Sequence, residues 1–186
     1  MKNKIAVYLI ILIAISVMIN CQTGSKTPSN GKSYSGKKIL FINSYHTGYD
    51  WSDKIIKGAI PEIESADIDY KIFDMDGKRN PSIDHIKEAA LSAKKIIEEY
   101  KPDVVITLDD IAAKYLIVPY YKNSKIPFVF CGVNWDASVY GFPFKNVTGM
   151  IEVEYIGGLI GYMRDYAKGD RIGFISSDQE IEHKIA

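Results

Sequence analysis

The sequence of 186 residues lacks an excess of charge of either sign and contains only two cysteines. Its 23 basic and 23 acidic residues balance, so no basic face is implied and we expect no nucleic-acid partner. The cysteines, Cys21 and Cys131, form no CxxC pair and no metal-binding cluster. Cys131 lies in an apolar segment and is expected to pack as a small hydrophobic residue.

Signatures of catalysis are also missing. The chain has no GxSxG, no HExxH and no phosphate-binding GxxxxGK[ST] motif. The three histidines, His46, His85 and His183, are scattered, and no serine or cysteine nucleophile is evidently paired with His46. We therefore predict no catalytic residues, no metal and no cofactor, and we do not expect an enzyme. A hydrolase that uses His46 is the alternative.

The N-terminal hydrophobic run is too short for a membrane span. Ile5–Ile19 has 15 residues, whereas a transmembrane helix needs about 20. Two lysines precede this run, which is typical of a secretory signal. It ends at Met18-Ile19-Asn20-Cys21, which resembles the cleavage box of bacterial lipoproteins, although that pattern prefers Leu first and a small residue before Cys. We expect residues 1–20 to be a signal peptide and Cys21 to carry the lipid; the alternative is an uncleaved signal anchor. Either way, we expect an exported, membrane-anchored protein.

The body of the chain begins with KILFINSYHTGYDW, at Lys38–Trp51. The apolar run Ile39–Ile42 predicts a strand buried on both faces, as in a parallel sheet. The four rings that follow surround Gly48 and lie on the loop after this strand; they are Tyr45, His46, Tyr49 and Trp51. Their flat faces and polar tips suit ligand recognition. The alternative is that they only cap the edge of the sheet.

Strands then alternate with helices. The predicted strands are Ile39–Asn43, Ile68–Phe73, Val104–Leu108, Pro127–Cys131 and Val147–Ile151. The predicted helices are Ser52–Glu64, a helix that begins at Pro81 with Asn80 as its cap, a helix capped by Asp109, and Val153–Ala167. This alternation predicts an α/β fold with a doubly wound parallel sheet in the strand order 2-1-3-4-5.

Ligands of open α/β sheets bind beyond the carboxyl ends of the strands, where the strand order reverses. In this order that point lies between the first and third strands, which brings Ser44–Trp51 beside Leu108–Ile111, a segment that includes the acidic pair Asp109-Asp110. Asn134 and Trp135 follow the fourth strand and come next along the same edge. The acidic pair is equally explained by helix capping and a favourable helix dipole.

Four segments, taken in order, resemble a known family. They are KILFINSYHTGYDWSDKIIKGAIPEI, VVITLDDIAAKYL, IPFVFCGVN and NVTGMIEVE, within Lys38 to about Ser177. They are similar to the substrate-binding proteins of ABC transporters with the type I periplasmic-binding-protein fold. The resemblance implies two α/β lobes with a hinge near Thr148–Glu152 and a small ligand, such as an amino acid, between the lobes. It also implies delivery by a monomer to a membrane permease. Placed by strand-end geometry, the implied ligand-binding residues are Ser44, Tyr45, Tyr49, Trp51, Asp109 and Asn134.

The predicted organisation has four parts. Residues 1–20 form the signal, 21–37 a flexible tether rich in Ser, Gly and Lys, 38–150 the N-terminal lobe, and 151–186 the hinge with the start of a second lobe. The last part includes a predicted strand at Arg171–Ser176. We expect most of the second lobe to be missing from the sequence.

Two other functions remain open. One is an extracytoplasmic sensor module of a bacterial signalling protein with the same fold. The other is a flavodoxin-like or Rossmann enzyme, which the single glycine of Asn43–Tyr49 disfavours because phosphate-binding loops need several. The ligand itself, whether an amino acid, a sugar or a nucleoside, is not specified by the sequence.

Overall fold

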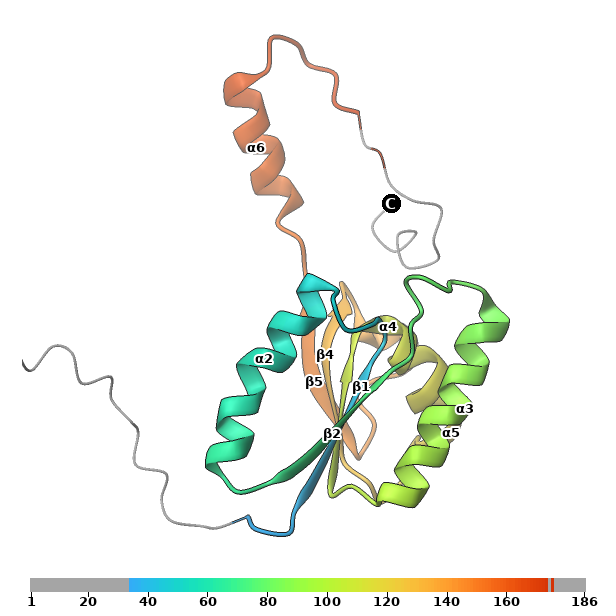
Figure 1. The fold of residues 1–186 in the computed structure, drawn as a ribbon. Helices are drawn as coiled ribbons and strands as arrows, with labels where there is room; N and C mark the ends of the chain where they lie inside the picture. The colour runs from blue at the N-terminus through green and yellow to red at the C-terminus, as the bar shows by residue number, and fades with distance from the viewer. Residues whose placement is uncertain (1–33, 174, 176–186) are drawn as a thin grey trace, which may run out of the picture. The chain divides into compact units, whose positions relative to one another are not determined.

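A computed structural model describes residues 34–173 and 175 (Figure 1). Five strands form one sheet in the order β2-β1-β3-β4-β5, and every neighbouring pair is parallel. The strands are β1 (Lys38–Asn43), β2 (Asp69–Asp74), β3 (Val104–Leu108), β4 (Phe128–Asn134) and β5 (Val147–Glu152). The predicted α/β class and strand order are confirmed.

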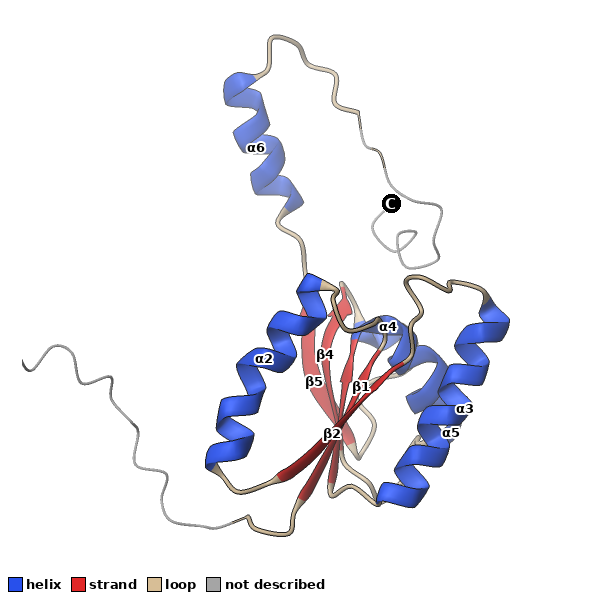
Figure 2. Cartoon of the chain, in the orientation of Figure 1, coloured by secondary structure: helices blue, strands red, loops and turns tan. Residues whose placement is uncertain are grey.

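Helices lie against both faces of this sheet, as Figure 2 shows. The helical segments are α2 (Asp50–Ser65), α3 (Ile83–Tyr100), α4 (Asp109–Ala112), the π-helical turn η1 (Ala113–Ile117), α5 (Val118–Tyr120), the 3₁₀ turn η2 (Ala137–Tyr140) and α6 (Ile156–Tyr166). One face of the sheet packs against α2, and the opposite face packs against α3, α4 and η1. Right-handed crossovers between parallel strands produce this two-sided arrangement.

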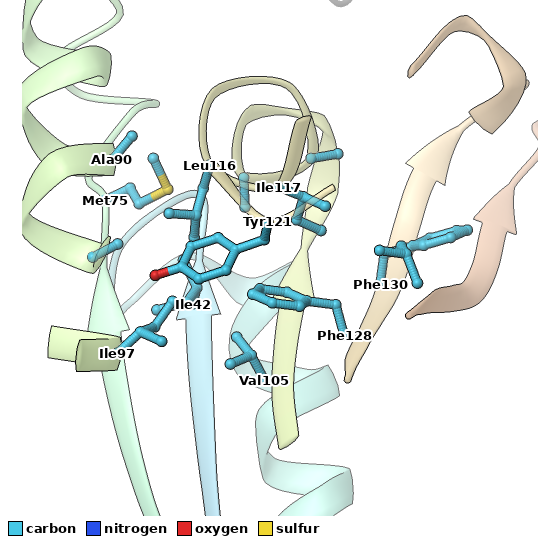
Figure 3. Close-up of a cluster of buried hydrophobic side chains, with 14 of the residues drawn as sticks. Ile42, Met75, Ala90, Ile97, Val105, Leu116, Ile117, Tyr121, Phe128 and Phe130 are labelled. Atoms are coloured by element: carbon cyan, nitrogen blue, oxygen red, sulfur yellow. The ribbon is translucent and has the colours of Figure 1, made fainter. Parts of the chain in front are cut away.

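The larger core lies between the sheet and the helices α3 to α5 (Figure 3). Leu40, Ile42 and Val105 point to this side because alternate residues of a strand face opposite sides of the sheet. On the other side, Phe41 and Leu108 pack against Ile56 and Ile63 of α2. Burying one such side chain fully contributes about 1.5–3 kcal/mol to the free energy of unfolding. The packing on both faces of the sheet holds the carboxyl ends of the strands in fixed positions.

The first two helices begin at other residues than predicted. Helix α2 begins at Asp50 instead of Ser52, because the Asp53 amide donates to the Tyr49 carbonyl (3.0 Å) and closes the first turn there; the Asp53 carboxylate also accepts from the Gly48 amide (2.9 Å). Helix α3 begins at Ile83, with Ser82 as its cap (3.3 Å from the His85 amide). Asn80 is not the cap, since its side chain donates to Asp76 (2.8 Å) within the preceding turn.

Strand β4 continues three residues beyond its predicted end at Cys131. Gly132, at a φ of 74°, takes up a change of register against β5, and the pairing continues at Val133. Positive φ is readily available to glycine, so the residue expected to end the strand forms a bulge within it. Asn134 is consequently the last residue of β4 rather than part of the loop after it.

After β5 the chain forms α6, which is shorter at both ends than the predicted helix Val153–Ala167 and buries none of its side chains. The predicted strand Arg171–Ser176 is not formed over its described residues, 171–173 and 175. In the described part of the chain, no helix has both the length and the hydropathy that a membrane span requires.

Candidate functional site

The carboxyl ends of β1, β3 and β4 are neighbours in the sheet. Asn43 is paired with Leu108, and Leu108 is paired with Cys131. The segments that leave these ends therefore meet at one edge, where all six predicted ligand-binding residues lie. We call the following set the carboxyl-edge site: Tyr45, Tyr49, Trp51, Lys78, Asp109, Asp110, Asn134 and Tyr140.

Tyr45 joins the first strand to the third. Its side chain is buried, and its hydroxyl donates to Asp109 Oδ2 over 2.6 Å. The other oxygen, Asp109 Oδ1, accepts from the Asp110 amide at 2.6 Å. Asp109 was predicted to cap the helix, but α4 begins at Asp109 itself, with a φ of 71°. Its carboxylate thus accepts from the Tyr45 hydroxyl and from the adjacent Asp110 amide, rather than from an amide two or three residues further along the helix as a capping side chain does.

Asp110 joins the third strand to the fourth. Its Oδ2 accepts from the amide nitrogen of Asn134 (2.9 Å) and from the Asn134 side-chain nitrogen (2.7 Å). Its Oδ1 accepts from the Tyr140 hydroxyl at 2.6 Å. All four carboxylate oxygens of Asp109 and Asp110 therefore accept hydrogen bonds from within the protein, as burial of such groups requires.

Ser44 has a similar internal role. Its fully buried Oγ donates to the carbonyl of Leu108 and accepts from the Ala112 amide at 3.0 Å. The hydroxyl from the end of β1 thereby caps α4, the task that the sequence had assigned to Asp109. Both hydrogen-bonding functions of Ser44 are used within the protein, so the structure places it beneath the site as support.

The rings of the first loop pack edge to face. The ring centroids of Tyr45 and Tyr49 are 4.7 Å apart and those of Tyr45 and Trp51 are 6.0 Å apart, with interplanar angles of 62° and 71°. Such pairs contribute about 0.5–1.5 kcal/mol beyond burial. Tyr45 is the buried ring, whereas Tyr49 and Trp51 are partly exposed. These two rings are consequently the ones that a ligand can reach.

Helix α2 begins two residues earlier than predicted, so Trp51 lies in its first turn. Its Nε1 donates to Glu152 Oε1, at the end of β5, over 3.3 Å. The indole also covers Gly132, where an added Cβ would lie 2.3 Å from Trp51 Cζ2. The bulge glycine in β4 therefore makes room for this ring.

Lys78 belongs to the site but was not recognised in the sequence. It follows β2, and its ammonium nitrogen lies 5.2 Å from the Tyr45 ring centroid and 5.5 Å from that of Tyr49. These are cation–π distances. The sequence could have indicated this role, because the segment MDGKRN (residues 75–80) follows β2, the strand next to β1, and therefore lies at the same sheet edge.

Burial sets the ionisation of the site. It raises the pKa of Asp109 to about 6, and the nearby Asp110 acts in the same direction. Hydrogen bonds from Tyr45 and the Asp110 amide, together with the charge of Lys78, partly oppose that rise. Burial, followed by the negative charge of Asp109, raises the pKa of Tyr45 as well. Tyr45 therefore remains a hydrogen-bond donor at neutral pH.

The residue after β4 is unusual for its backbone and its side chain. Trp135 has a φ of 58°, which is uncommon for a bulky residue. Its indole nitrogen is buried and has no hydrogen-bond partner within the described residues. Leaving such a donor unpaired costs about 1–3 kcal/mol. Residues held in sparsely populated backbone conformations cluster at functional sites.

Two cavities lie away from the six predicted residues. One, of about 580 Å³, is lined by residues 123–125, 127–129 and 145–148, where β4 and β5 begin. This is the opposite edge of the sheet. The other, of about 550 Å³, is lined by residues of the segment 162–172 alone. In the described residues, no group of three or more His, Cys, Asp or Glu is arranged to hold a metal ion.

Cys21, the signal segment and the tether up to residue 33 lie outside the described residues. Comparison of the chain with protein-family models, with curated proteins and with solved structures finds no match.

Proposed function

We propose that residues 38–150 form the ligand-binding lobe of an exported solute-binding lipoprotein, which delivers a small molecule to an ABC permease in the membrane. The lipid on Cys21 holds the protein at that membrane. The lobe binds without chemical conversion, and its ligand lies at the carboxyl-edge site.

One observation carries this proposal. Tyr45, Asp109, Asp110 and Asn134 come from three different strand ends, yet they form one buried hydrogen-bonded network. The rings of Tyr49 and Trp51 pack against Tyr45 of this network and remain partly exposed. A ligand that meets preorganised groups loses less entropy in ordering them.

The location supports the same function. The network crosses from β1 to β3, where the strand order reverses and ligands of doubly wound sheets bind. Trp135, at the end of β4, offers a buried N–H that lacks an acceptor among the described residues. A ligand with a flat face packs against the partly exposed rings of Tyr49 and Trp51 at the same edge.

A thermal-shift screen of the full chain tests the proposal. The compounds are amino acids, nucleosides and sugars, all of which can pack against aromatic rings. A compound at 100 times its Kd adds about 2.7 kcal/mol to the free energy of unfolding and raises the melting temperature. A shift with at least one compound is expected. No shift throughout the three classes contradicts the proposal.

A further inference from the structure

Lys78 is the cationic side chain of the carboxyl-edge site, and its ammonium forms none of the ion pairs found within the described residues. Its ammonium group lies over two tyrosine rings instead, at 5.2 Å from Tyr45 and 5.5 Å from Tyr49. A cation–π contact leaves the N–H donors that point away from the rings available to a further partner. Lys78 is only partly exposed, so this position is confined.

The turn after β2 holds Lys78 at this point. The amides of Met75, Asp76 and Gly77 donate to the carbonyls of Asn43, Tyr45 and Ser44 over 2.8, 2.7 and 3.0 Å. Gly77 itself is packed so closely that a Cβ would lie 3.0 Å from the Ser44 carbonyl oxygen. The backbone beside Lys78 is consequently fixed to the loop that carries the rings.

The other groups of the turn are paired with one another. The Asp76 carboxylate accepts from Arg79 Nε (2.6 Å) and from the side chain of Asn80 (2.8 Å). Arg79 is therefore bound to Asp76, whereas Lys78 is directed to the aromatic rings. Of these two cations, Arg79 stabilises the turn through Asp76, and Lys78 belongs to the site.

The carboxylates of the site do not compete for this cation by direct contact. Asp109 and Asp110 accept hydrogen bonds from Tyr45, Tyr140, Asn134 and the backbone on all four oxygens. A cationic ligand placed on the tyrosine rings would meet Lys78, which already occupies that position and repels it. An anionic group meets a favourable charge at the same point.

We propose that Lys78 binds the anionic group, a carboxylate or a phosphate, of a small ligand whose flat ring packs against Tyr49 and Trp51. This inference rests on the proposed binding function of the site and specifies its ligand class, a small aromatic or heterocyclic anion. Lys78 binds the charge, and the partly exposed rings bind the flat part. The class includes carboxylates and phosphate esters, which the test separates.

The test is isothermal titration calorimetry of the full chain with two pairs of probes. Indole-3-acetate and its neutral amide differ in a carboxylate, and adenosine 5′-monophosphate and adenosine differ in a phosphate. At least one anion is expected to bind tenfold or more tightly than its neutral partner, because a hydrogen bond to a charged group is worth this much in affinity. The anion that binds more tightly than its neutral partner shows whether the site takes a carboxylate or a phosphate. Raising the ionic strength weakens the binding of that anion.

Substitutions locate the effect. Lys78→Met is expected to lower the affinity for the bound anion at least tenfold, while Lys78→Arg keeps most of it. Lys122→Met is the matched control, since the ammonium of Lys122 also lies over a ring, 5.1 Å from the centroid of Phe144. Each methionine variant loses one charge; Lys78→Met loses its contacts with two rings, and Lys122→Met loses its contact with one. Circular dichroism and the melting temperature confirm that each is folded.

Two negative results have different meanings. If the neutral probes bind as tightly as the anions and Lys78→Met changes neither, the inference is overturned while the binding function stands. If the folded wild-type chain binds none of the four probes and gives no thermal shift with any amino acid, nucleoside or sugar, the proposed function fails, and this inference fails with it.

Discussion

The indole nitrogen of Trp51 donates a hydrogen bond of 3.3 Å to the carboxylate of Glu152, 101 residues further along the chain. The backbone carbonyl of Glu152 also accepts from the amide of Trp135 at 2.8 Å. Both tryptophans of the sequence are thus bound to the last residue of β5. The first turn of α2, the end of β4 and the end of β5 are held together at the candidate site.

Gly132→Ala is expected to disturb this arrangement strongly. The new methyl group would lie 2.3 Å from Trp51 Cζ2, and the backbone φ of 74° is unfavourable for alanine. Overpacking and the left-handed backbone together lower the free energy of unfolding by about 2–4 kcal/mol. Urea denaturation measures this loss, and a change in tryptophan emission reports the displacement of Trp51.

Gly36→Ala is the control for this experiment. Gly36 has nearly the same φ, 78°, but nothing lies within 4 Å of an added Cβ. Only the backbone penalty of about 1–2 kcal/mol applies. Equal losses in the two alanine variants would contradict the close contact between Gly132 and Trp51.

The raised pKa of Asp109 predicts that the free energy of unfolding falls as the pH rises. Burial raises the pKa of Asp109 in the folded state to about 6, above its ordinary value of 3.8, so between these values the folded chain binds more protons than the unfolded chain. The free energy of unfolding therefore decreases from about pH 4 to about pH 6, by roughly 3 kcal/mol, and this contribution changes no further above that range.

Asp109→Asn isolates this effect, because asparagine has almost the same shape and does not titrate. The difference in unfolding free energy between wild type and Asp109→Asn, measured in urea at each pH, is expected to fall over this window. A difference that stays constant from about pH 4 to about pH 7 would contradict a raised pKa.

Tyr45→Phe removes the hydroxyl that donates to Asp109 over 2.6 Å. A buried carboxylate then lacks one of its donors, which lowers the free energy of unfolding by about 1–3 kcal/mol at neutral pH. The pKa of Asp109 rises further, because the bond from Tyr45 favours its ionised form. Chemical denaturation measures the stability, and the carboxyl ¹³C shift measured by NMR follows the titration.

Tyr49→Phe serves as the comparison, since Tyr49 is only partly buried and its packing against Tyr45 involves the ring alone. Its substitution is expected to change the unfolding free energy by less than about 0.5 kcal/mol. A similar loss in both phenylalanine variants would speak against a special role of the bond from Tyr45 to Asp109.

Cys21 is the predicted lipid attachment residue. Cells that express the chain in the presence of radiolabelled palmitate are expected to label wild type and Cys131→Ala but not Cys21→Ala. The sequence has only these two cysteines, so the pair of variants covers every thiol. Label retained in Cys21→Ala would contradict lipidation at this position.

The sheet was predictable because its sequence signals are local. Apolar runs such as Ile39–Ile42 specify buried strands, and the alternation with helices leaves few permitted topologies. The ends of the helices and strands were harder to predict. Gly132 reads as a strand end, but it forms a bulge beside Trp51, a contact that depends on a ring 81 positions earlier in the sequence.

The predicted topology located the candidate site, but the sequence did not show the role of each residue in it. The strand order placed Tyr45, Asp109 and Asn134 at one edge, and the structure brings their side chains into a single network. Sequence spacing does not reveal which polar groups satisfy one another. Ser44 supports α4 from below, and Lys78 enters from the strand on the other side of β1.

The central claim is that the carboxyl edge of the sheet binds a small molecule, and tryptophan fluorescence tests it most directly. Both tryptophans, Trp51 and Trp135, lie at this edge, so the emission of the full chain reports on it alone. The account predicts a saturable change in emission with any compound that raises the melting temperature, and the change persists in Trp135→Phe, where Trp51 is the only reporter. A compound that stabilises the chain at saturation and leaves the emission of both indoles unchanged would contradict it.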